Sequence, residues 1–236
     1  MILTKPLPFL VTIVSSVIAV SSVGAEPFSV VTPIHPAVLL QAMPKTPTNW
    51  KCQFSRGQNL ISGSGIPVTQ AIRRYEITIE DTSISPPVPK IVQCKILLMD
   101  IGSKAEDAED FKSRLMRPTS GTSAHKRLDA DNKTLGVFNI SNGGSIMFDG
   151  ICGDRLILQM ETLGASEKEF LAVFKSADFS ALASLSRNLP EKKTTSRIFT
   201  LHIADEFNPK LNRSYQAGTV DSEEESNRNI APPSAQ

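Results

Sequence analysis

The stretch LGVFNISNGGSIMFDGICGDRLILQME, residues 135–161, decides the fold class. It holds three apolar-rich segments of strand length, 135–140, 145–152 and 155–161, which short polar connections separate. The first connection, residues 141–144, contains Asn-Gly and Gly-Gly, which supply the positive φ angles of tight hairpin turns. A Gly-Asp dipeptide supplies the second turn. The stretch therefore predicts a three-stranded antiparallel meander.

Three further strands are expected upstream of the meander. Apolar and polar residues alternate along Trp50–Phe54, Tyr75–Glu80 and Ile91–Met99, with the period of a half-buried strand. A Pro-rich connection separates the last two strands and is expected to be exposed. Residues 197–203 are a candidate for an additional edge strand.

Two segments carry the signals of a helix start. Ser103 with Glu106, and Ser166 with Glu169, have the spacing of a capping box, and an apolar stripe follows each of them. A third helical turn is expected at residues 179–185. The strands and helices are grouped rather than alternating, so we predict an α+β fold. It would be an antiparallel sheet of about six strands with two or three helices packed on one face.

The first 25 residues predict export. Lys5 gives a positive start, residues 7–20 are almost wholly apolar, and small residues lead to Ala25. This is the pattern of a cleaved signal peptide, which would make the mature chain secreted or periplasmic. The alternative is an uncleaved membrane anchor formed by residues 1–25. No second apolar run of spanning length follows, so no membrane span is expected after cleavage.

The remaining chain divides into three parts by composition. Residues 26–49 are rich in proline and are expected to form an arm or linker. Residues 50–205 carry the periodic patterns and should form a single α+β domain. Residues 206–236 are poor in apolar residues and rich in Ser, Asn, Glu and Pro, which predicts a disordered C-terminal tail.

The charge balance argues against nucleic acid as a partner. The chain has 25 basic and 24 acidic residues, and Lys5 is the only charged residue of the first 25, so the mature chain is formally neutral. Nucleic-acid binding requires a concentrated basic surface that displaces counterions. No nucleic-acid partner is therefore expected. The partner is otherwise unknown, and a cell-envelope protein and a small ligand are the candidates.

The three cysteines are the most specific feature of the mature chain. Alternation places Cys52 with Trp50 and Phe54 on an apolar face, and Cys94 and Cys152 also point to the apolar sides of their strands. None belongs to a C-x-x-C motif, so neither a redox pair nor a zinc site is indicated. In an oxidising compartment we expect a Cys52–Cys94 disulfide, with Cys52–Cys152 as the alternative. The competing interpretation is three separate buried thiols that pack as small hydrophobic residues.

No sequence motif identifies an active site, a metal site or a cofactor site. His35, His125 and His202 do not cluster along the chain, and the G-x-S-x-G and His-Glu-x-x-His motifs are absent. No glycine-rich phosphate loop occurs, and no cofactor is expected. A local basic patch that could contact an anion consists of Arg114, Arg117, Lys126 and Arg127.

These patterns favour a non-enzymatic role for an exported protein. They resemble no family closely enough to transfer functional residues from it. The interpretation they favour is a ligand-binding or cell-envelope assembly protein. One alternative is a secreted hydrolase that uses His125 with a nearby Ser or Asp. Another is an envelope subunit anchored in the membrane through residues 1–25.

Overall fold

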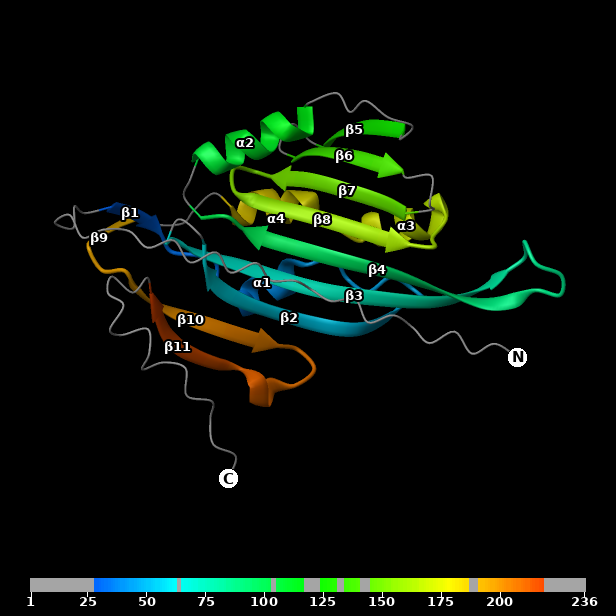
Figure 1. Ribbon diagram of the computed structural model, residues 1–236, viewed down its shortest axis with the longest axis horizontal. Helices are drawn as coiled ribbons and strands as arrows, with labels where there is room; N and C mark the ends of the chain where they lie inside the picture. Colours follow the sequence, from blue (N-terminus) through cyan, green and yellow to red (C-terminus); the bar gives the residue numbers. More distant parts are fainter. Residues whose placement is uncertain are drawn as a thin grey trace, which may run out of the picture. The chain divides into compact units, whose positions relative to one another are not determined.

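The structure of the protein is a computed structural model (Figure 1). The predicted signal segment and the last 18 residues, 219–236, lie outside the described residues. The structure describes residues 28–62, 65–102, 105–116, 124–130, 134–140, 145–186 and 191–218.

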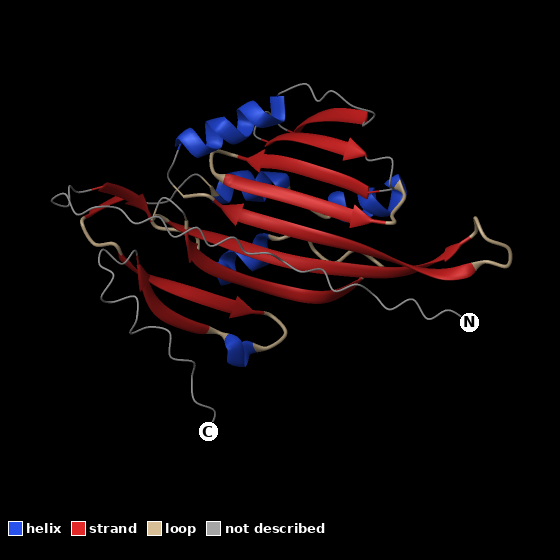
Figure 2. Ribbon diagram, in the orientation of Figure 1, coloured by secondary structure: helices blue, strands red, loops and turns tan. Residues whose placement is uncertain are grey.

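Nine strands of the described chain form one antiparallel sheet, which dominates the fold (Figure 2). They are β2 (Lys51–Ile61), β3 (Pro67–Asp81), β4 (Val88–Asp100), β5 (Ala124–Ala130), β6 (Thr134–Ile140), β7 (Ser145–Cys152), β8 (Leu156–Leu163), β10 (Ile198–Asp205) and β11 (Arg213–Gly218). Their order across the sheet is β11-β10-β2-β3-β4-β8-β7-β6-β5. A separate two-stranded sheet pairs the remaining two strands, β1 (Phe28–Val31) and β9 (Glu191–Thr194).

Four α-helices and one short 3-10 helix accompany the sheets in the described residues. They are α1 (Pro36–Ala42), α2 (Ala105–Met116), α3 (Glu167–Phe174), α4 (Phe179–Leu185) and the 3-10 helix η1 (Pro209–Leu211). The α+β class is confirmed, and so is the meander, which is formed by β6, β7 and β8. The predicted numbers of about six strands and two or three helices are both too low.

The main core lies on one face of the sheet, against α1, α3 and α4. These three helices lie behind the sheet in Figure 1. Tyr75 from β3 and Phe148 from β7 are fully buried there, as is Phe170 from α3. Phe138, Phe174 and Phe179 extend the cluster, with ring centroids 4.9 to 6.0 Å apart. Aromatic packing therefore fixes α3 and α4 on β6 and β7.

The second helix contacts the sheet separately from this core. Ala108 of α2 is buried, as are Ile151 of β7 and Ile157 of β8, and none of the three belongs to the main core cluster. Alternation along β7 and β8 points Ile151 and Ile157 away from Phe148 and the main core. We therefore assign α2 to the opposite face, and the prediction that all helices share one face is wrong for α2.

The Pro-rich segment is part of the folded body. This segment contains β1 and α1, and Leu39 and Leu40 of α1 are 0% and 2% exposed. Pro36 stands in the first turn of α1, where its missing N–H is not needed. The prediction of a linker or loosely docked arm is therefore corrected, because two leucines bury this segment in the core.

The chain also remains regular beyond the predicted end of the domain. Residues 209–211 form η1, and residues 213–218 form β11, which pairs with β10 along six residues. The ordered body therefore extends to Gly218 rather than ending at Asp205 as predicted. Pairing with β10 satisfies the backbone hydrogen bonds of β11, so this segment forms a strand despite its low hydrophobicity. The proposed disordered tail is thereby limited to residues outside the described chain.

Candidate functional site

The three cysteines are thiols, and no disulfide joins any two of them. Tyr75 of β3 pairs with Cys52 on one side and with Cys94 on the other. The two cysteines are therefore two strand spacings apart, roughly 10 Å, whereas a disulfide requires Cα atoms within about 7 Å. Cys152 lies on β7, with β3, β4 and β8 between it and Cys52. Both predicted disulfides are wrong for this reason. Cys94 and Cys152 are buried thiols, as the competing interpretation expects, whereas Cys52 is only half-buried.

An irregularity in β2 also changes which side chains share a sheet face with Cys52. The register shifts between Cys52 and Phe54, as in a β-bulge, so the two side chains lie on opposite faces. The Phe54 ring instead packs under the guanidinium of Arg74, with 5.6 Å between the guanidinium carbon and the ring centroid. The expectation that Cys52 and Phe54 share the apolar face is therefore corrected.

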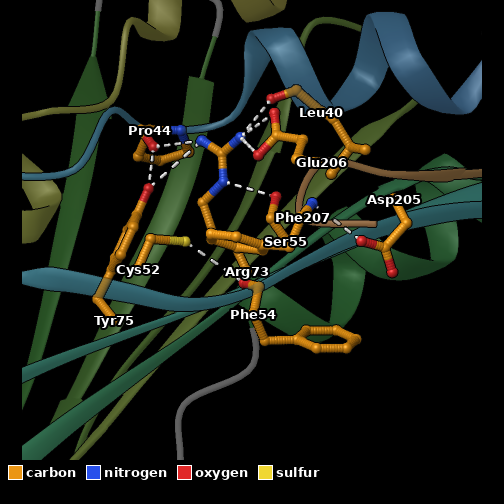
Figure 3. Close-up of polar contacts among 10 residues, drawn as sticks. All are labelled: Leu40, Pro44, Cys52, Phe54, Ser55, Arg73, Tyr75, Asp205, Glu206 and Phe207. Atoms are coloured by element: carbon orange, nitrogen blue, oxygen red, sulfur yellow. Dashed lines mark hydrogen bonds and ion pairs between the residues drawn. The ribbon is translucent and has the colours of Figure 1, made fainter. Parts of the chain in front are cut away.

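The most concentrated polar cluster surrounds Arg73, on the core face of β3 (Figure 3). Its Nε donates to Ser55 Oγ at 3.0 Å, and one Nη2 hydrogen is directed at the Glu206 carboxylate at 2.7 Å. The backbone carbonyls of Pro44 and Leu40 accept hydrogen bonds from Nη1 and Nη2 at 3.0 and 3.1 Å. The cluster thus joins α1, β2, β3 and the end of β10.

This cluster has the chemistry of a structural clamp. A guanidinium has five N–H donors, and the fifth is directed at Tyr75 Oη, 3.4 Å from Arg73 Nη1. The Arg73 side chain is 10% exposed and that of Glu206 is 38% exposed. Because the protein uses all five donors, no donor of Arg73 remains for an anionic ligand.

Besides Arg73 and Glu206, the cluster contains two ionisable groups, Cys52 and Tyr75, and burial favours the neutral form of each. Burial raises the pKa of the Cys52 thiol, although the nearby Arg73 charge acts in the opposite direction. Burial likewise raises the pKa of Tyr75, whose hydroxyl donates a hydrogen bond to the Pro44 carbonyl. A nucleophilic cysteine requires a lowered pKa. The cluster therefore lacks an activated nucleophile.

A second ion pair, which is buried, fixes the start of α1 to the sheet. Asp100 of β4 is fully buried and accepts hydrogen bonds from Arg155 Nε and Nη2 at 2.6 and 2.5 Å. Asp100 also accepts from the backbone N–H of Ile34 at 2.8 Å, and Thr69 donates to the Ile34 carbonyl at 2.6 Å. Both backbone groups of Ile34 are satisfied by side chains of the sheet, so the Pro-rich segment is docked at both of its ends.

His35 and His202 lie together although 167 residues separate them in the sequence. Their ring centroids are 4.6 Å apart. His35 Nδ1 accepts the backbone N–H of Ala37 at the start of α1, and His202 Nδ1 is 2.7 Å from Ser214 Oγ. Burial, and then the proximity of His202, lowers the pKa of His35. Sequence reasoning missed this pair because no local motif joins the two residues.

The predicted anion-contact patch is described only in part. Arg114 forms an ion pair with Asp110 at 3.2 Å on the surface of α2. Arg117 and the side chains of Lys126 and Arg127 lie outside the described residues, as does the side chain of His125. The patch and the alternative hydrolase site therefore stay predictions.

Two open surface depressions flank α3. They measure roughly 470 and 450 Å³, and Lys175 contributes to both. Lys45 and Phe179 line the first depression, and Leu171 lines the second.

Within the described ranges, no group of three or more His, Cys, Asp or Glu residues is placed to hold a metal ion. Of the helices that the structure describes, none has the length and apolar character to cross a bilayer.

The feature with the clearest functional geometry is the end of the β3–β4 hairpin. Pairing of β3 with β2 begins at Glu76, and pairing of β4 with β8 begins at Gln93. Five further residue pairs, from Ile77↔Val92 to Asp81↔Val88, join β3 only to β4. We call residues 77–92 the projecting hairpin, and Figure 1 shows it extending beyond the neighbouring strands.

Large apolar side chains are exposed on this hairpin and beside it. Ile84, Val88 and Ile91 are 51%, 40% and 58% exposed, and Leu163 at the adjoining end of β8 is 54% exposed. Alternation places Ile91 and Leu163 on the sheet face opposite the main core. A solvated two-stranded ribbon is only marginally stable by itself. Val88 lies on the other face of the ribbon from Ile91, because three residues separate the two along β4. Exposed apolar side chains gathered at one end of a sheet are a feature of protein-contact sites.

No protein-family model matches the chain, and neither the curated sequences nor the solved structures give a match. Arg73 could have been recognised from the sequence, because it has the same parity as the inward-facing residues Tyr75 and Ile77. Its partner Glu206 carries no such local signal, since 133 residues separate the two.

Proposed function

We propose that this chain is an exported, non-enzymatic assembly protein that binds a partner protein of the cell envelope through the projecting hairpin. One observation carries the proposal. Five residue pairs extend beyond the neighbouring strands, and Val88 and Ile91 within them and Ile84 in the turn are exposed to solvent. Protein interfaces bury apolar side chains of this kind at their centre.

The polar clusters support a binding role over catalysis. Arg73 and Asp100 each have their hydrogen-bonding capacity directed at groups of the protein itself. Cys52, the partly exposed thiol, has a raised pKa. Catalytic sites instead present a polar group to a cavity with its pKa adjusted toward the working pH. These clusters therefore act as internal supports that hold the sheet from which the hairpin extends.

Assembly is tested in the natural host by size-exclusion chromatography of the envelope fraction. The wild-type chain should elute with a mass well above that of the isolated protein. Replacing Ile84, Val88 and Ile91 by serine should release it as a monomer, because a contact surface would lose its apolar centre. Ile198→Ser is the matched control, since Ile198 is 65% exposed on β10, away from the hairpin. Elution of the wild type as a monomer, or retention of the triple variant in the complex, contradicts the proposal.

Export is tested on the same material by the intact mass. The proposal expects a mass that begins at Glu26, because residues 1–25 have the pattern of a cleaved signal. A full-length mass in the membrane fraction supports the anchored-subunit alternative instead. A full-length mass in the soluble cytoplasm contradicts both.

A further inference from the structure

We propose that the outer edge of β3 within the projecting hairpin, residues 77–81, binds an extended segment of the partner protein as an added β-strand. The inference rests on the proposed function and specifies how the hairpin binds. Strand addition to an exposed sheet edge combines main-chain hydrogen bonds with recognition of alternate side chains.

The edge is open in the part of the chain that the structure describes. β2 pairs with β3 as far as Lys51↔Glu76, and the next five residues of β3 pair only with β4. Backbone N–H and C=O groups of successive strand residues point to opposite edges. Alternate residues among Ile77 to Asp81 therefore present their backbone groups to the outer side. An added strand would lie where β2 would lie if it were longer.

The opposite edge of the hairpin is less suited to strand addition. Pro89 lies on β4 and has no N–H to donate, and Pro86 and Pro87 immediately precede that strand. The turn after β8 also approaches this edge, because a Cβ at Gly164 would lie 3.2 Å from Lys90 Cε. Natural sheets protect edges with proline and nearby loops in this way. Ile77, Thr78 and Ile79 on the β3 edge are instead β-branched residues that favour strand pairing.

Side chains along this edge define the chemistry of the partner segment. Ile77 and Ile79 face the core side of the sheet, whereas Glu76 and Glu80 face the other side, with Thr78 between them. Directly opposed cross-strand pairs favour apolar residues beside apolar ones and opposite charges beside each other. The partner segment should therefore alternate apolar residues with lysine or arginine.

The same charges oppose pairing of two copies of this chain. Residues 76–92 contain Glu76, Glu80 and Asp81 against a single cation, Lys90. Two β3 edges brought together would place acidic side chains near acidic side chains, which is destabilising. The occupant is therefore a different protein that supplies basic residues.

The test uses a synthetic acetylated peptide of seven residues in which valine and lysine alternate. Binding of the labelled peptide to the mature chain is measured by fluorescence polarisation. A peptide of the same composition with its lysines grouped, and a peptide N-methylated at alternate residues, are the controls. We expect binding of the alternating peptide alone, because grouping destroys the two-faced pattern and N-methylation removes strand donors.

Charge variants locate the binding edge. Glu80→Lys should weaken peptide binding about tenfold by replacing attraction with repulsion. Glu161→Lys is the matched control, since Glu161 is exposed on the same sheet face but lies on β8, which β4 separates from β3. Equal weakening by both variants, equal binding of the N-methylated peptide, or no binding at about 1 mM peptide overturns strand addition. The proposal is also overturned if the mature chain dimerises and Glu80→Lys abolishes the dimer, because the edge would then bind a second copy of the chain.

Failure of this inference is distinguishable from failure of the proposed function. If the serine variants of the hairpin release the protein from its complex but the peptide results are negative, the hairpin binds through side chains alone. If the serine variants leave the complex intact, the hairpin is not the contact surface, whatever the peptide does.

Discussion

Replacing Arg73 by leucine should lower the free energy of unfolding by about 3 kcal/mol, because breaking a buried charged hydrogen-bond network is strongly destabilising. Three of the groups that Arg73 contacts limit this loss of stability, because each keeps another hydrogen-bond partner or can reach water. The Leu40 carbonyl still accepts from Met43 N, and the Pro44 carbonyl still accepts from Tyr75. Water can reach the 38% exposed side chain of Glu206. The magnitude therefore lies near the lower end of the range for a fully buried ion pair, about 3–5 kcal/mol.

The next residue provides a matched control within the same strand. Arg74 carries the same charge and lies on the opposite face, where it contacts the Phe54 ring. Arg74→Leu should change the free energy of unfolding by at most about 1 kcal/mol, the magnitude of an exposed cation–π contact. A difference of about 2 kcal/mol between two adjacent arginines would thus separate burial and hydrogen bonding from net charge.

The assay is urea unfolding followed by the fluorescence of Trp50. This is the single tryptophan of the chain, and it is 6% exposed at the junction between the Pro-rich segment and β2. Its emission should therefore report release of that segment together with global unfolding. The reasoning is refuted if Arg73→Leu lies within about 0.5 kcal/mol of wild type, the usual range for a neutral surface substitution. It is also refuted if Arg74→Leu destabilises as strongly.

Three other outcomes follow from particular contacts. In the native protein only Cys52 should react with a thiol reagent, whereas three thiols should react after denaturation, because the other two cysteines are buried. Any disulfide found by intact mass would contradict the sheet register. Gly153→Ala should destabilise by about 2 kcal/mol, since φ is +64° and a Cβ would lie 2.0 Å from Ser186 Oγ. Combining it with Ser186→Ala should restore part of that loss, and a purely additive result would refute the clash. Unfolding free energy should fall as the pH drops below about 6.5, because His35 has a lowered pKa in the folded state. His35→Gln should flatten this dependence, and an unchanged pH profile would contradict a contribution from the contact between His35 and His202.

The local sequence pattern was sufficient to predict a strand wherever that strand buries one face completely. Burial alternates along most of β7 and β8, which a Gly-Asp turn joins, so the bounds of the three meander strands could be predicted to within two residues. The Ser166 capping box is formed as expected, because both of its partners lie within one turn of α3. In these elements the sequence neighbours that carry the signal are also the neighbours in space.

Prediction failed where the deciding partner is distant in sequence. The bulge between Cys52 and Phe54 changes the face of every later residue of β2, and no local pattern marks it. Cysteine pairing depends on how many strands intervene, and that number is fixed only by the sheet order. The clamp between Arg73 and Glu206 likewise joins β3 to a residue that composition assigns to a tail.

The Pro-rich segment shows why amino-acid composition underestimated the extent of the folded domain. Its position against the sheet also bears on the proposed function. Proline prevents a long regular element there, but α1 needs only seven residues to bury Leu39 and Leu40. Arg73 then holds the end of the segment on β3, near Glu76 where the projecting hairpin begins, whereas Asp100 holds the start of the segment at the far end of β4. A ribbon that is unsupported at its tip is positioned most effectively when its base is rigid, because ordering before binding reduces the entropy lost on association. Under the proposed function, the Arg73 cluster is an internal support that orients the contact surface of the hairpin. If this is correct, Arg73→Leu should weaken assembly in the host even at temperatures where the variant remains folded.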